Sequence, residues 1–348
     1  MGRGTVYNSE MTKNWENVSK ENKKLVTDFI RYLKSNDKSP QTIHQYEEWL
    51  KVFFSWNYEE NEDRFFIELK KRDFVNYFGW LREEGYSANR VAALKSVLSS
   101  LSNEIELLYE DLYPTFRNQV RSLEAVHIVP VREKTVLSNE EIDNMLSTMV
   151  DKEYYQEACF LALLCSSGCR RSEAVQMKVD FFNESREVFD GKWKMYLTPQ
   201  IRSKGRGKIG KQIKKYILKE TFQPYFEKWM EQREKMGVVC DALFVVKKGS
   251  EWVPASITTA DSFAKSISKW FGINFYNHSC RHYFCTKLKR LQVPDDIIVQ
   301  IFSWETSTML SIYNDIPQEE ALNAFFKNFA FAGEDPGDDD EEDEVKAD

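Results

Sequence analysis

Apolar residues recur every three or four positions through most of residues 19–122. The stretch 21–35, ENKKLVTDFIRYLKS, places Leu25, Phe29 and Leu33 on one helical face, and three further stretches repeat this period. A period near 3.6 residues indicates amphipathic helices that each bury one face. We therefore expect residues 19–122 to form a compact bundle of four or five helices.

The breaks between these helices carry residues that start or end helices. Ser39, followed by Pro40, and Ser87 each stand just before an apolar period. A serine hydroxyl at that place accepts a hydrogen bond from a free backbone N–H, and proline suits the first helical position. Gly85 follows the third stretch, where it is expected to end the helix.

Residues 123–136, LEAVHIVPVREKTV, contain Pro130 and have no amphipathic face. Such a segment is typical of a linker between domains. Ser138, with Glu141 three residues later, then forms a capping box that opens a new helix. The expected segments are an extension at 1–18, the bundle at 19–122, the linker at 123–136, a second domain at 137–331 and a disordered acidic tail at 332–348.

The second domain is expected to be mainly α-helical with a small β-hairpin. The apolar run at 154–168 indicates a buried helix that ends at Gly168. Two strand-like runs, at 192–199 and 211–218, flank the basic cluster SKGRGKIG at 203–210 and predict a basic hairpin. Further helices are expected to begin near Glu220, Ser256 and His278, before a last apolar segment at 319–331.

The composition is that of a folded protein outside the membrane. Of the 348 residues, 42% are hydrophobic and 30% are charged, and no apolar run is long enough to span a bilayer. No secretory segment follows Met1, and Val6 occupies the place where a myristoylation motif needs Ser or Thr. We therefore expect a cytoplasmic protein.

The net charge of −7 comes from the end of the sequence. The last 15 residues hold ten acidic residues and one lysine, so the remainder carries about +2. Such a run most simply forms a disordered tail whose charges repel one another. The alternative is a tail that mimics DNA and competes for a basic groove.

The cysteines predict neither a disulfide framework nor a metal site. No two of them show CxxC spacing, and a chain of this length needs no covalent staples. Cys280 stands between His278 and His282, but no second half of a zinc site accompanies them. We expect no metal and no other cofactor. The cysteines are Cys159, Cys165, Cys169, Cys240, Cys280 and Cys285.

Three separated segments carry cations suited to binding a phosphate. Arg170 follows a helix end, Lys204 and Lys208 lie on the predicted hairpin, and His278 and Arg281 are three apart on a predicted helix. Positions three apart share a helical face, so His278 and Arg281 should project together. Taken singly, each of these residues has an ordinary structural explanation. Their combination predicts a phosphate clamp.

Trp304 and Tyr313 stand nine residues apart, near the end of the second domain. On one unbroken helix this spacing would make the two side chains face opposite ways. The residues Thr306, Ser307 and Thr308 supply a break, and a second short helix capped there would turn Tyr313 back toward the cations.

This order of residues resembles the tyrosine recombinases, the phage integrase family of site-specific DNA recombinases. The family motif T-G-x-R-x-x-E is similar to Ser167, Gly168, Arg170 and Glu173, with Ser in place of Thr. The N-terminal sequence KSPQTIHQY also looks like the family's core-binding domain, so the resemblance covers most of residues 20–330.

The most specific part of the resemblance lies near the end of the second domain. The family's H-x-x-R-H matches His278, Arg281 and His282 residue for residue. Its L-G-H/W, nine residues before the nucleophile, is similar to the run FSW that ends at Trp304, ahead of Tyr313. Phe-Ser in place of Leu-Gly is a departure from the family pattern.

The resemblance implies a two-domain, C-shaped clamp around DNA and a reaction that needs neither metal nor ATP. Tyr313 would be the nucleophile and would form a 3′-phosphotyrosine, while Arg170 and Arg281 hold the phosphate. Lys204 would be the general acid, with Lys208 as the alternative. His278 would take the tyrosine proton and Trp304 would position the phosphate, while Glu173 and His282 orient the two arginines.

Double-stranded DNA at a specific recombination site is the implied partner, with four copies assembled on it. The protein would be a monomer or weak oligomer in solution, would associate with the nucleoid when bound to DNA, and would serve a mobile element. The segment 319–331 is expected to pack on a neighbouring protomer. Predicted phosphate contacts are Lys38, Lys70, Arg72, Arg90, Lys95, Arg202, Arg206 and Lys208.

Three alternatives remain open from sequence. A degenerate recombinase would bind DNA without cutting it, and a type IB topoisomerase would share the chemistry but need no specific site. A metal-dependent nuclease fits poorly, because no cluster of acidic residues accompanies the basic ones in the folded part.

Overall fold

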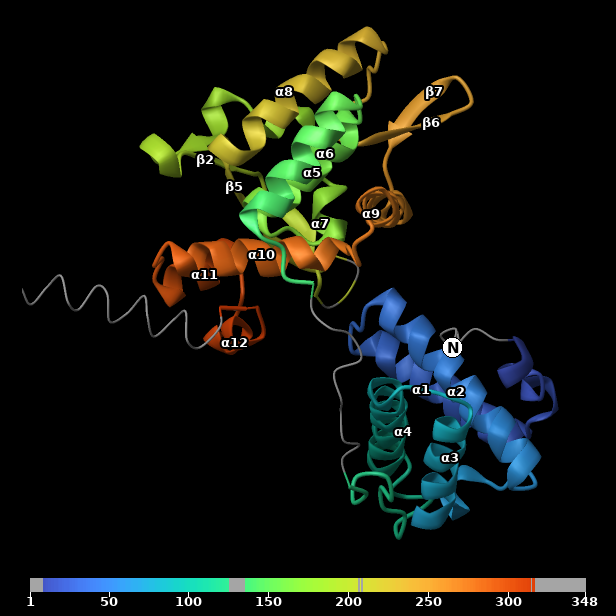
Figure 1. The fold of residues 1–348 in the computed structure, drawn as a ribbon. Helices are drawn as coiled ribbons and strands as arrows, with labels where there is room; N and C mark the ends of the chain where they lie inside the picture. The colour runs from blue at the N-terminus through green and yellow to red at the C-terminus, as the bar shows by residue number, and fades with distance from the viewer. Residues whose placement is uncertain (1–8, 125–134, 206, 208, 314, 317–348) are drawn as a thin grey trace, which may run out of the picture. The chain divides into compact units, whose positions relative to one another are not determined.

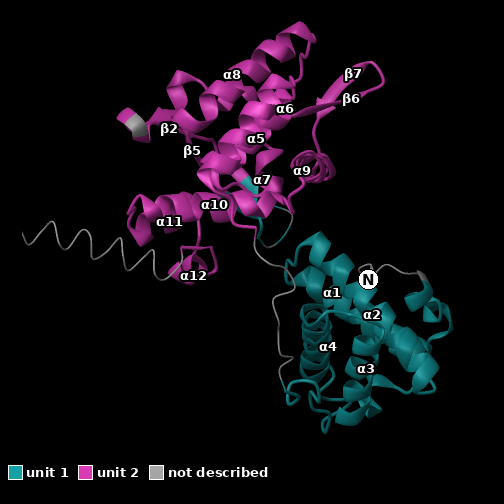
Figure 2. Cartoon of the chain, viewed as in Figure 1, with its two compact units in different colours: residues 1–133, 202–212 teal, residues 134–201, 213–348 magenta. Residues whose placement is uncertain are grey.

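The computed structural model describes residues 9–124, 135–205, 207, 209–313 and 315–316 (Figure 1). The chain divides into two compact units (Figure 2). Unit 1 comprises residues 1–133 with 202–212, and unit 2 comprises residues 134–201 with 213–348. No described helix is both long and apolar enough to cross a membrane. The clamp arrangement and the domain limits expected from sequence stay predictions.

Unit 1 is a helical bundle, as its apolar period predicts. Phe53 occupies its centre, where its ring stacks on Phe74 at a centroid distance of 5.9 Å and meets Tyr77 edge-on at 4.9 Å. All three rings are buried, and such pairs add to the free energy gained from burial alone. The helices are α1 (Lys20–Ser35), α2 (Pro40–Glu60), α3 (Lys71–Glu83) and α4 (Ala88–Leu108).

The predicted helix limits in unit 1 are confirmed. Ser39 precedes α2 and accepts a hydrogen bond from the backbone N–H of Thr42 at 3.2 Å, with Pro40 at the first position. Ser87 caps α4 in the same way. Gly85 follows α3 with a φ of 81°, a left-handed conformation that glycine adopts without strain.

Unit 2 is built around α6 (Tyr155–Ser167), an almost wholly buried helix. It packs against α5 (Asn139–Asp151), α8 (Lys219–Lys235) and α10 (Asn277–Arg290), and α5, α6 and α8 lie side by side in Figure 1. A helix that is apolar on every side needs neighbours on every side. This helix therefore forms the centre of the unit's core, and its C-terminal end carries the candidate site.

The helix starts and ends predicted for unit 2 are also confirmed. Ser138 and Glu141 form the predicted capping box at the start of α5. Gly168 ends α6 in a left-handed conformation. Helices begin close to the positions expected from sequence. The remaining α-helices are α7 (Arg171–Ala174), α9 (Ile257–Phe271), α11 (Asp295–Phe302) and α12 (Leu310–Tyr313).

The predicted basic hairpin needs a correction. The run 192–199 and the run 211–218 are not two simple arms, because the second run divides into β4 (Lys211–Ile213) and β5 (Tyr216–Leu218). β4 pairs with β3 (Ile201–Ser203), whereas β5 pairs antiparallel with β2 (Met195–Leu197).

The division occurs at Lys215, which lies between β4 and β5. Its backbone N–H bonds to the side-chain Oγ1 of Thr198 at 2.9 Å, and its carbonyl accepts from the backbone N–H of Thr198 at 3.0 Å. A side chain thus replaces a backbone carbonyl as the acceptor, and the regular ladder is interrupted there. β1 (Glu187–Val188) completes the three-stranded sheet in the order β1–β2–β5.

A second hairpin was not predicted from sequence. β6 (Val245–Lys248) and β7 (Glu251–Pro254) pair antiparallel, with Val246 opposite Val253. Both strands are short, and their charged residues and terminal proline hide the alternation that marks a strand. Segment 319–331, the acidic tail and most of the predicted linker lie outside the described residues.

Candidate active site

Arg281 links three elements of unit 2. Its side chain is fully buried on α10, and its guanidinium donates to the carbonyl of Gly168 at the end of α6. It also donates to the carbonyl of Phe302 at the end of α11, at 3.4 Å. The rings of Phe302 and Trp304 lie 4.6 and 5.3 Å from the guanidinium carbon. The arginine therefore fixes α10 against the ends of α6 and α11.

Gly168 lets these elements approach one another. Its φ is 58°, and a Cβ at this position would lie 2.6 Å from a ring carbon of Phe302. Any larger residue would meet both backbone strain and a steric clash. This close packing requires glycine at position 168.

Arg170 is held by Glu173 from the first turn of α7. The Glu173 carboxylate is fully buried and accepts from Nη1 of Arg170 at 2.8 Å and from its backbone N–H at 2.9 Å. The Arg170 side chain remains 28% exposed. The carboxylate thus orients a guanidinium that remains partly exposed.

His278 and Tyr313 are in direct contact. Nε2 of His278 lies 2.6 Å from the phenol oxygen of Tyr313. Burial, followed by the nearby Arg281 charge, lowers the pKa of His278 to about 4. The imidazole is therefore neutral at pH 7, so Nε2 can accept the phenol hydrogen in the tautomer protonated on Nδ1.

The break predicted between Trp304 and Tyr313 is confirmed. After α11 ends at Phe302, Ser303 takes a left-handed conformation and a 3₁₀ turn (Ser307–Met309) leads into α12. The Tyr313 ring thereby stacks on Trp304 at a centroid distance of 5.1 Å. The expected cap is wrong, because the N-cap residue Thr306 makes no side-chain capping bond.

Two residues that the sequence analysis missed fasten the segment around Tyr313 to α10. The carboxylate of Asp315 lies 2.9 Å from Nδ1 of His282. The hydroxyl of Thr286 donates to the Tyr313 carbonyl at 3.4 Å and accepts from the Asp315 backbone N–H at 3.2 Å. The acid two residues after Tyr313 was the signal available in the sequence.

A third missed residue is Lys215, whose side chain is fully buried. Its ammonium lies 3.4 Å from the carbonyl of Ile301, near the end of α11, and 5.6 Å from the centre of the Phe302 ring. Burial lowers the pKa of Lys215, and the nearby charges of Arg281 and Arg170 also lower it. This lysine therefore belongs to the same cluster as the two arginines.

The structure describes only some of the cations that were predicted on the hairpin. Lys204 follows β3 and is exposed, as is Arg202. Arg206 and Lys208 lie outside the described residues. The segment 202–212 belongs to unit 1, and the choice of Lys204 as the general acid stays a prediction.

The predicted phosphate contacts in the helical bundle have different surroundings. Lys70 and Arg72 are exposed at the start of α3, and Lys38 is half-buried just before α2. Arg90 lies over the Tyr86 ring, and the Lys95 ammonium donates to the carbonyls of Leu123 and Glu124. The Lys95 ammonium is thus already hydrogen-bonded to carbonyls within the protein.

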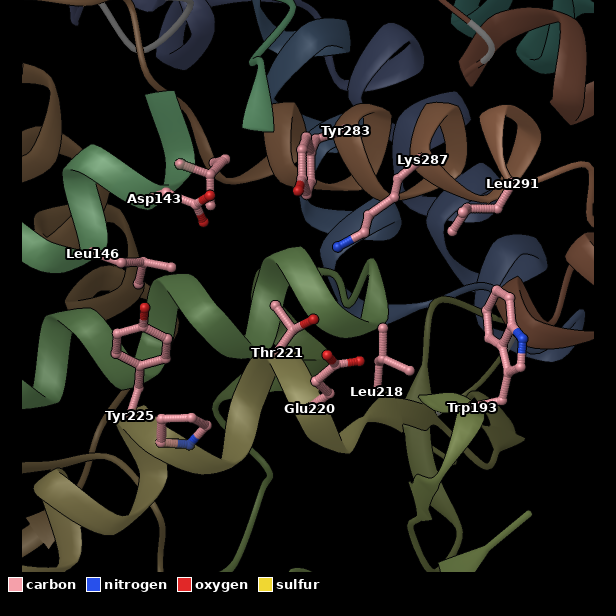
Figure 3. Close-up of a pocket in the computed structure, with 12 residues that line it drawn as sticks. Asp143, Leu146, Trp193, Leu218, Glu220, Thr221, Tyr225, Tyr283, Lys287 and Leu291 are labelled. Atoms are coloured by element: carbon pink, nitrogen blue, oxygen red, sulfur yellow. The ribbon is translucent and has the colours of Figure 1, made fainter. Parts of the chain in front are cut away.

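The cluster is separate from a cleft of about 420 Å³ on the same unit (Figure 3). Asp143 of α5, Tyr225 of α8 and Tyr283 and Lys287 of α10 line that cleft. The residues that line it do not include the clustered arginines, His278 or Tyr313. In the described parts of the chain, no group of His, Cys, Asp and Glu has the arrangement of a metal site.

The cluster contains side chains whose chemistry suits phosphoryl transfer. The structure brings two arginines, a neutral histidine, a tryptophan and a tyrosine hydroxyl together in unit 2. Arginines bind phosphate oxygens, and a histidine beside a hydroxyl can accept its proton. The candidate site is built from Arg170, Glu173, Lys215, His278, Arg281, His282, Trp304 and Tyr313.

Sequence profiles of two parts of one family match the chain. The profile of the phage integrase family matches residues 135–320, and that of the phage integrase N-terminal SAM-like domain matches residues 25–108. The recombinase-like protein YomM, derived from the SPbeta prophage of Bacillus subtilis strain 168, is 30% identical over 320 residues. That match covers 90% of this chain and 92% of YomM.

More distant relatives and solved structures match most of the chain. Tyrosine recombinase XerA of Pyrococcus horikoshii is 24% identical over 306 residues, which cover 88% of this chain and 94% of XerA. A solved structure of the Tn1549 transposon integrase in complex with circular intermediate DNA matches 86% of this chain and 98% of its own, at 16% identity and a TM-score of 0.62. A solved structure of a lambda integrase dimer bound to a core site matches 90% of this chain and 82% of its own, at 16% identity and a TM-score of 0.60.

Proposed function

The chain belongs to the phage integrase family and is a tyrosine-type site-specific DNA recombinase, and from this premise we propose that Tyr313 is its nucleophile. The observation that carries the proposal is the 2.6 Å contact between the Tyr313 hydroxyl and Nε2 of His278. A phenol is almost fully protonated at neutral pH, so its oxygen needs a base before it attacks phosphorus. The neutral imidazole of His278 supplies that base.

The proposed first step exchanges one phosphate ester for another. The Tyr313 oxygen bonds to phosphorus as the bond from phosphorus to the 5′ oxygen breaks, which leaves a 3′-phosphotyrosine and a 5′ hydroxyl. His278 takes the phenol proton, and Lys204 gives a proton to the leaving oxygen. The energy of the ester is kept, so the second strand can be joined by the reverse reaction without ATP or a metal ion.

The two arginines are proposed to bind the non-bridging oxygens of the phosphate. Two buried donors of the cluster have no hydrogen-bond partner among the described residues, namely Nε of Arg281 and the indole N–H of Trp304. A buried donor without an acceptor is costly, and a bound phosphate would supply acceptors for both. Arg170, oriented by Glu173, would complete the anion site.

DNA at a specific recombination site is the proposed substrate, and we propose four protomers on it. The segment 319–331 of one protomer would cover an apolar surface of the next. Light scattering with DNA tests this assembly: a chain truncated before Ala321 should bind DNA but not reach the mass of a tetramer. A truncated chain that still assembled four protomers would contradict it.

Unit 1 is proposed to add phosphate contacts through Lys38, Lys70, Arg72, Arg90 and Lys95. Arg202, Arg206 and Lys208 of the hairpin segment would act in the same way. Contacts of this kind position a protein on DNA and make its affinity fall as salt rises. We also propose a cytoplasmic protein that associates with the nucleoid and serves a mobile element, in line with the prophage origin of YomM.

A nicked DNA substrate tests the nucleophile. A nick a few nucleotides to the 3′ side of the scissile phosphate makes the leaving piece, which carries the new 5′ hydroxyl, short enough to diffuse away. The covalent complex then accumulates and migrates slowly on a denaturing gel. Native protein should form this complex in the presence of EDTA, and Tyr313→Phe should not. Tyr225→Phe, in the separate cleft, is the matched control and should react like native protein.

The same assay separates the alternatives. A native protein that forms no covalent complex on any selected DNA would overturn the proposal in favour of a degenerate DNA-binding protein. A covalent complex on plasmids without a recombination site, with relaxation of their supercoils, would indicate a topoisomerase.

A further inference from the structure

Lys215 is a buried cation that the proposed reaction does not use. Its side chain is fully buried between β4 and β5, and the ammonium has one long hydrogen bond, of 3.4 Å, to the Ile301 carbonyl. No carboxylate of the described residues forms an ion pair with it. Burying an ammonium without a carboxylate costs far more than one long hydrogen bond returns. Folding alone therefore gives no reason for a lysine at this position.

The groups around Lys215 are those of the phosphate site. Burial is the main cause that lowers the pKa of Lys215, whereas Cys169, in the turn after α6, and Glu173 of α7 raise it. Arg281 of α10 and Arg170 lower it. Lys215 is thus a third positive charge near the two arginines, and the buried carboxylate of Glu173 bonds to Arg170.

Lys215 and Arg281 bind neighbouring carbonyls at the end of one helix. Lys215 donates to Ile301 and Arg281 donates to Phe302, the last two residues of α11. The Phe302 ring lies against both cations, at 5.6 and 4.6 Å. Cations are favoured at a helix C-terminus because the free carbonyls there carry partial negative charge.

This helix end leads directly to Trp304. Ser303 takes the left-handed turn that follows α11, and its hydroxyl donates to the carbonyl of Lys214 at 3.4 Å. The segment 214–215 therefore contacts the turn twice, once through a backbone carbonyl and once through the buried ammonium. A change at Lys215 would reach the indole through the two residues between Ile301 and Trp304.

We propose that Lys215 is a positioning residue for the recombination reaction, whose charged ammonium fixes the end of α11 so that Arg281 and Trp304 meet the scissile phosphate as its charge grows. The proposal rests on the proposed function, because it assumes that the phosphate binds in this cluster. Lys215 does not touch DNA, since its side chain is fully buried. It acts through its contacts with Ile301 and Phe302, and through the positive potential that its charge adds near the two arginines.

The charge state of Lys215 gives the proposal a distinctive signature. Burial is the main cause that lowers its pKa, and the surrounding charges partly cancel one another. A phosphate bound to the arginines would favour the charged form. The cleavage rate of native protein should therefore fall on the alkaline side as Lys215 loses its proton.

Lys215→Met tests this role, because methionine has a similar length and no charge. The rate of covalent-complex formation on a saturating nicked substrate should fall about tenfold or more, as expected when a residue that orients the reacting groups is lost. DNA affinity should change less than twofold, the alkaline fall in rate should begin at a higher pH, and the midpoint of urea unfolding should stay the same or rise. Lys214→Met, at the exposed neighbouring lysine, is the matched control and should behave like native protein in all four measurements.

The outcomes separate this proposal from the proposed function. Native protein that forms no covalent complex contradicts the proposed function itself. Native protein that reacts, beside a Lys215→Met variant with the same rate and the same pH profile, overturns the role of Lys215 alone. Loss of folding in both Lys215→Met and Lys215→Leu would also overturn it, because the lysine would then be needed for the fold rather than for the reaction.

Discussion

The phenol oxygen of Tyr313 and Nε2 of His278 lie 2.6 Å apart, although 34 residues separate them in the chain. α10 supplies the histidine, and α12 returns the tyrosine to it after the left-handed turn at Ser303. The contact joins a hydroxyl to an imidazole whose surroundings keep it neutral. The geometry therefore places a nucleophile and its base within one hydrogen bond before any DNA is present.

The pKa of His278 predicts how stability depends on pH. Its folded value of about 4 is below the ordinary value of 6.5, so unfolding takes up a proton between these two values. The stabilising contribution is complete above pH 6.5 and is lost as the pH falls toward 4. Urea unfolding from pH 4 to 8 should show this loss in native protein and a smaller one in His278→Gln. Equal pH dependence in the two proteins would contradict the assignment.

Thr286 should matter for catalysis although it cannot touch DNA directly. Its buried hydroxyl bridges the Tyr313 carbonyl and the Asp315 backbone N–H. Thr286→Val keeps the shape of the side chain but removes both hydrogen bonds, which should lower the free energy of unfolding by about 1–2 kcal/mol. The rate of covalent-complex formation should fall about tenfold, because the nucleophile is less firmly held.

The matched control for Thr286 is Thr258→Val, near the exposed start of α9. It should leave the cleavage rate unchanged. A Thr286→Val variant that loses stability but cleaves at the native rate would show that α10 does not position Tyr313.

Much of the fold could be predicted because its signals are local. Ser39, Ser87 and Ser138 act through hydrogen bonds to residues three positions away, so the sequence alone reveals where these helices begin. The short strands were harder to place. Lys211–Ile213 and Tyr216–Leu218 form one continuous run of letters, and only the bond between Lys215 and Thr198 reveals that they pair with different partners.

The candidate site was partly predictable for a related reason. Arg170, His278, Arg281 and Tyr313 carry ordinary functional chemistry and stand at recognisable spacings. Lys215 could not be found in this way, because a lysine in a basic, strand-like run is usually exposed. Its burial depends on α11 packing over it from about 86 residues away in sequence.

Gly168 is predicted to tolerate no side chain. Gly168→Ala would combine a left-handed backbone with a Cβ that lies 2.6 Å from the Phe302 ring. The free energy of unfolding should fall by about 2–4 kcal/mol from these two effects. Adding Phe302→Leu should recover part of the loss by making room for the methyl group. A double variant that is no more stable than Gly168→Ala in urea unfolding would exclude the clash as a cause.

Trp304 tests whether a proton-exchanging side chain is needed beside the phosphate. Its indole N–H is buried and has no acceptor within the described ranges, while its ring stacks on Tyr313. Trp304→Phe keeps an aromatic ring and removes the donor, so the rate of covalent-complex formation should fall about tenfold to a hundredfold while stability changes little. Trp304→His restores an N–H and should recover part of the rate. The recovery should be largest near neutral pH, where histidine can also exchange protons. If Trp304→Phe reacted as fast as native protein, the indole would act through packing alone, and the hydrogen bond to phosphate would be ruled out.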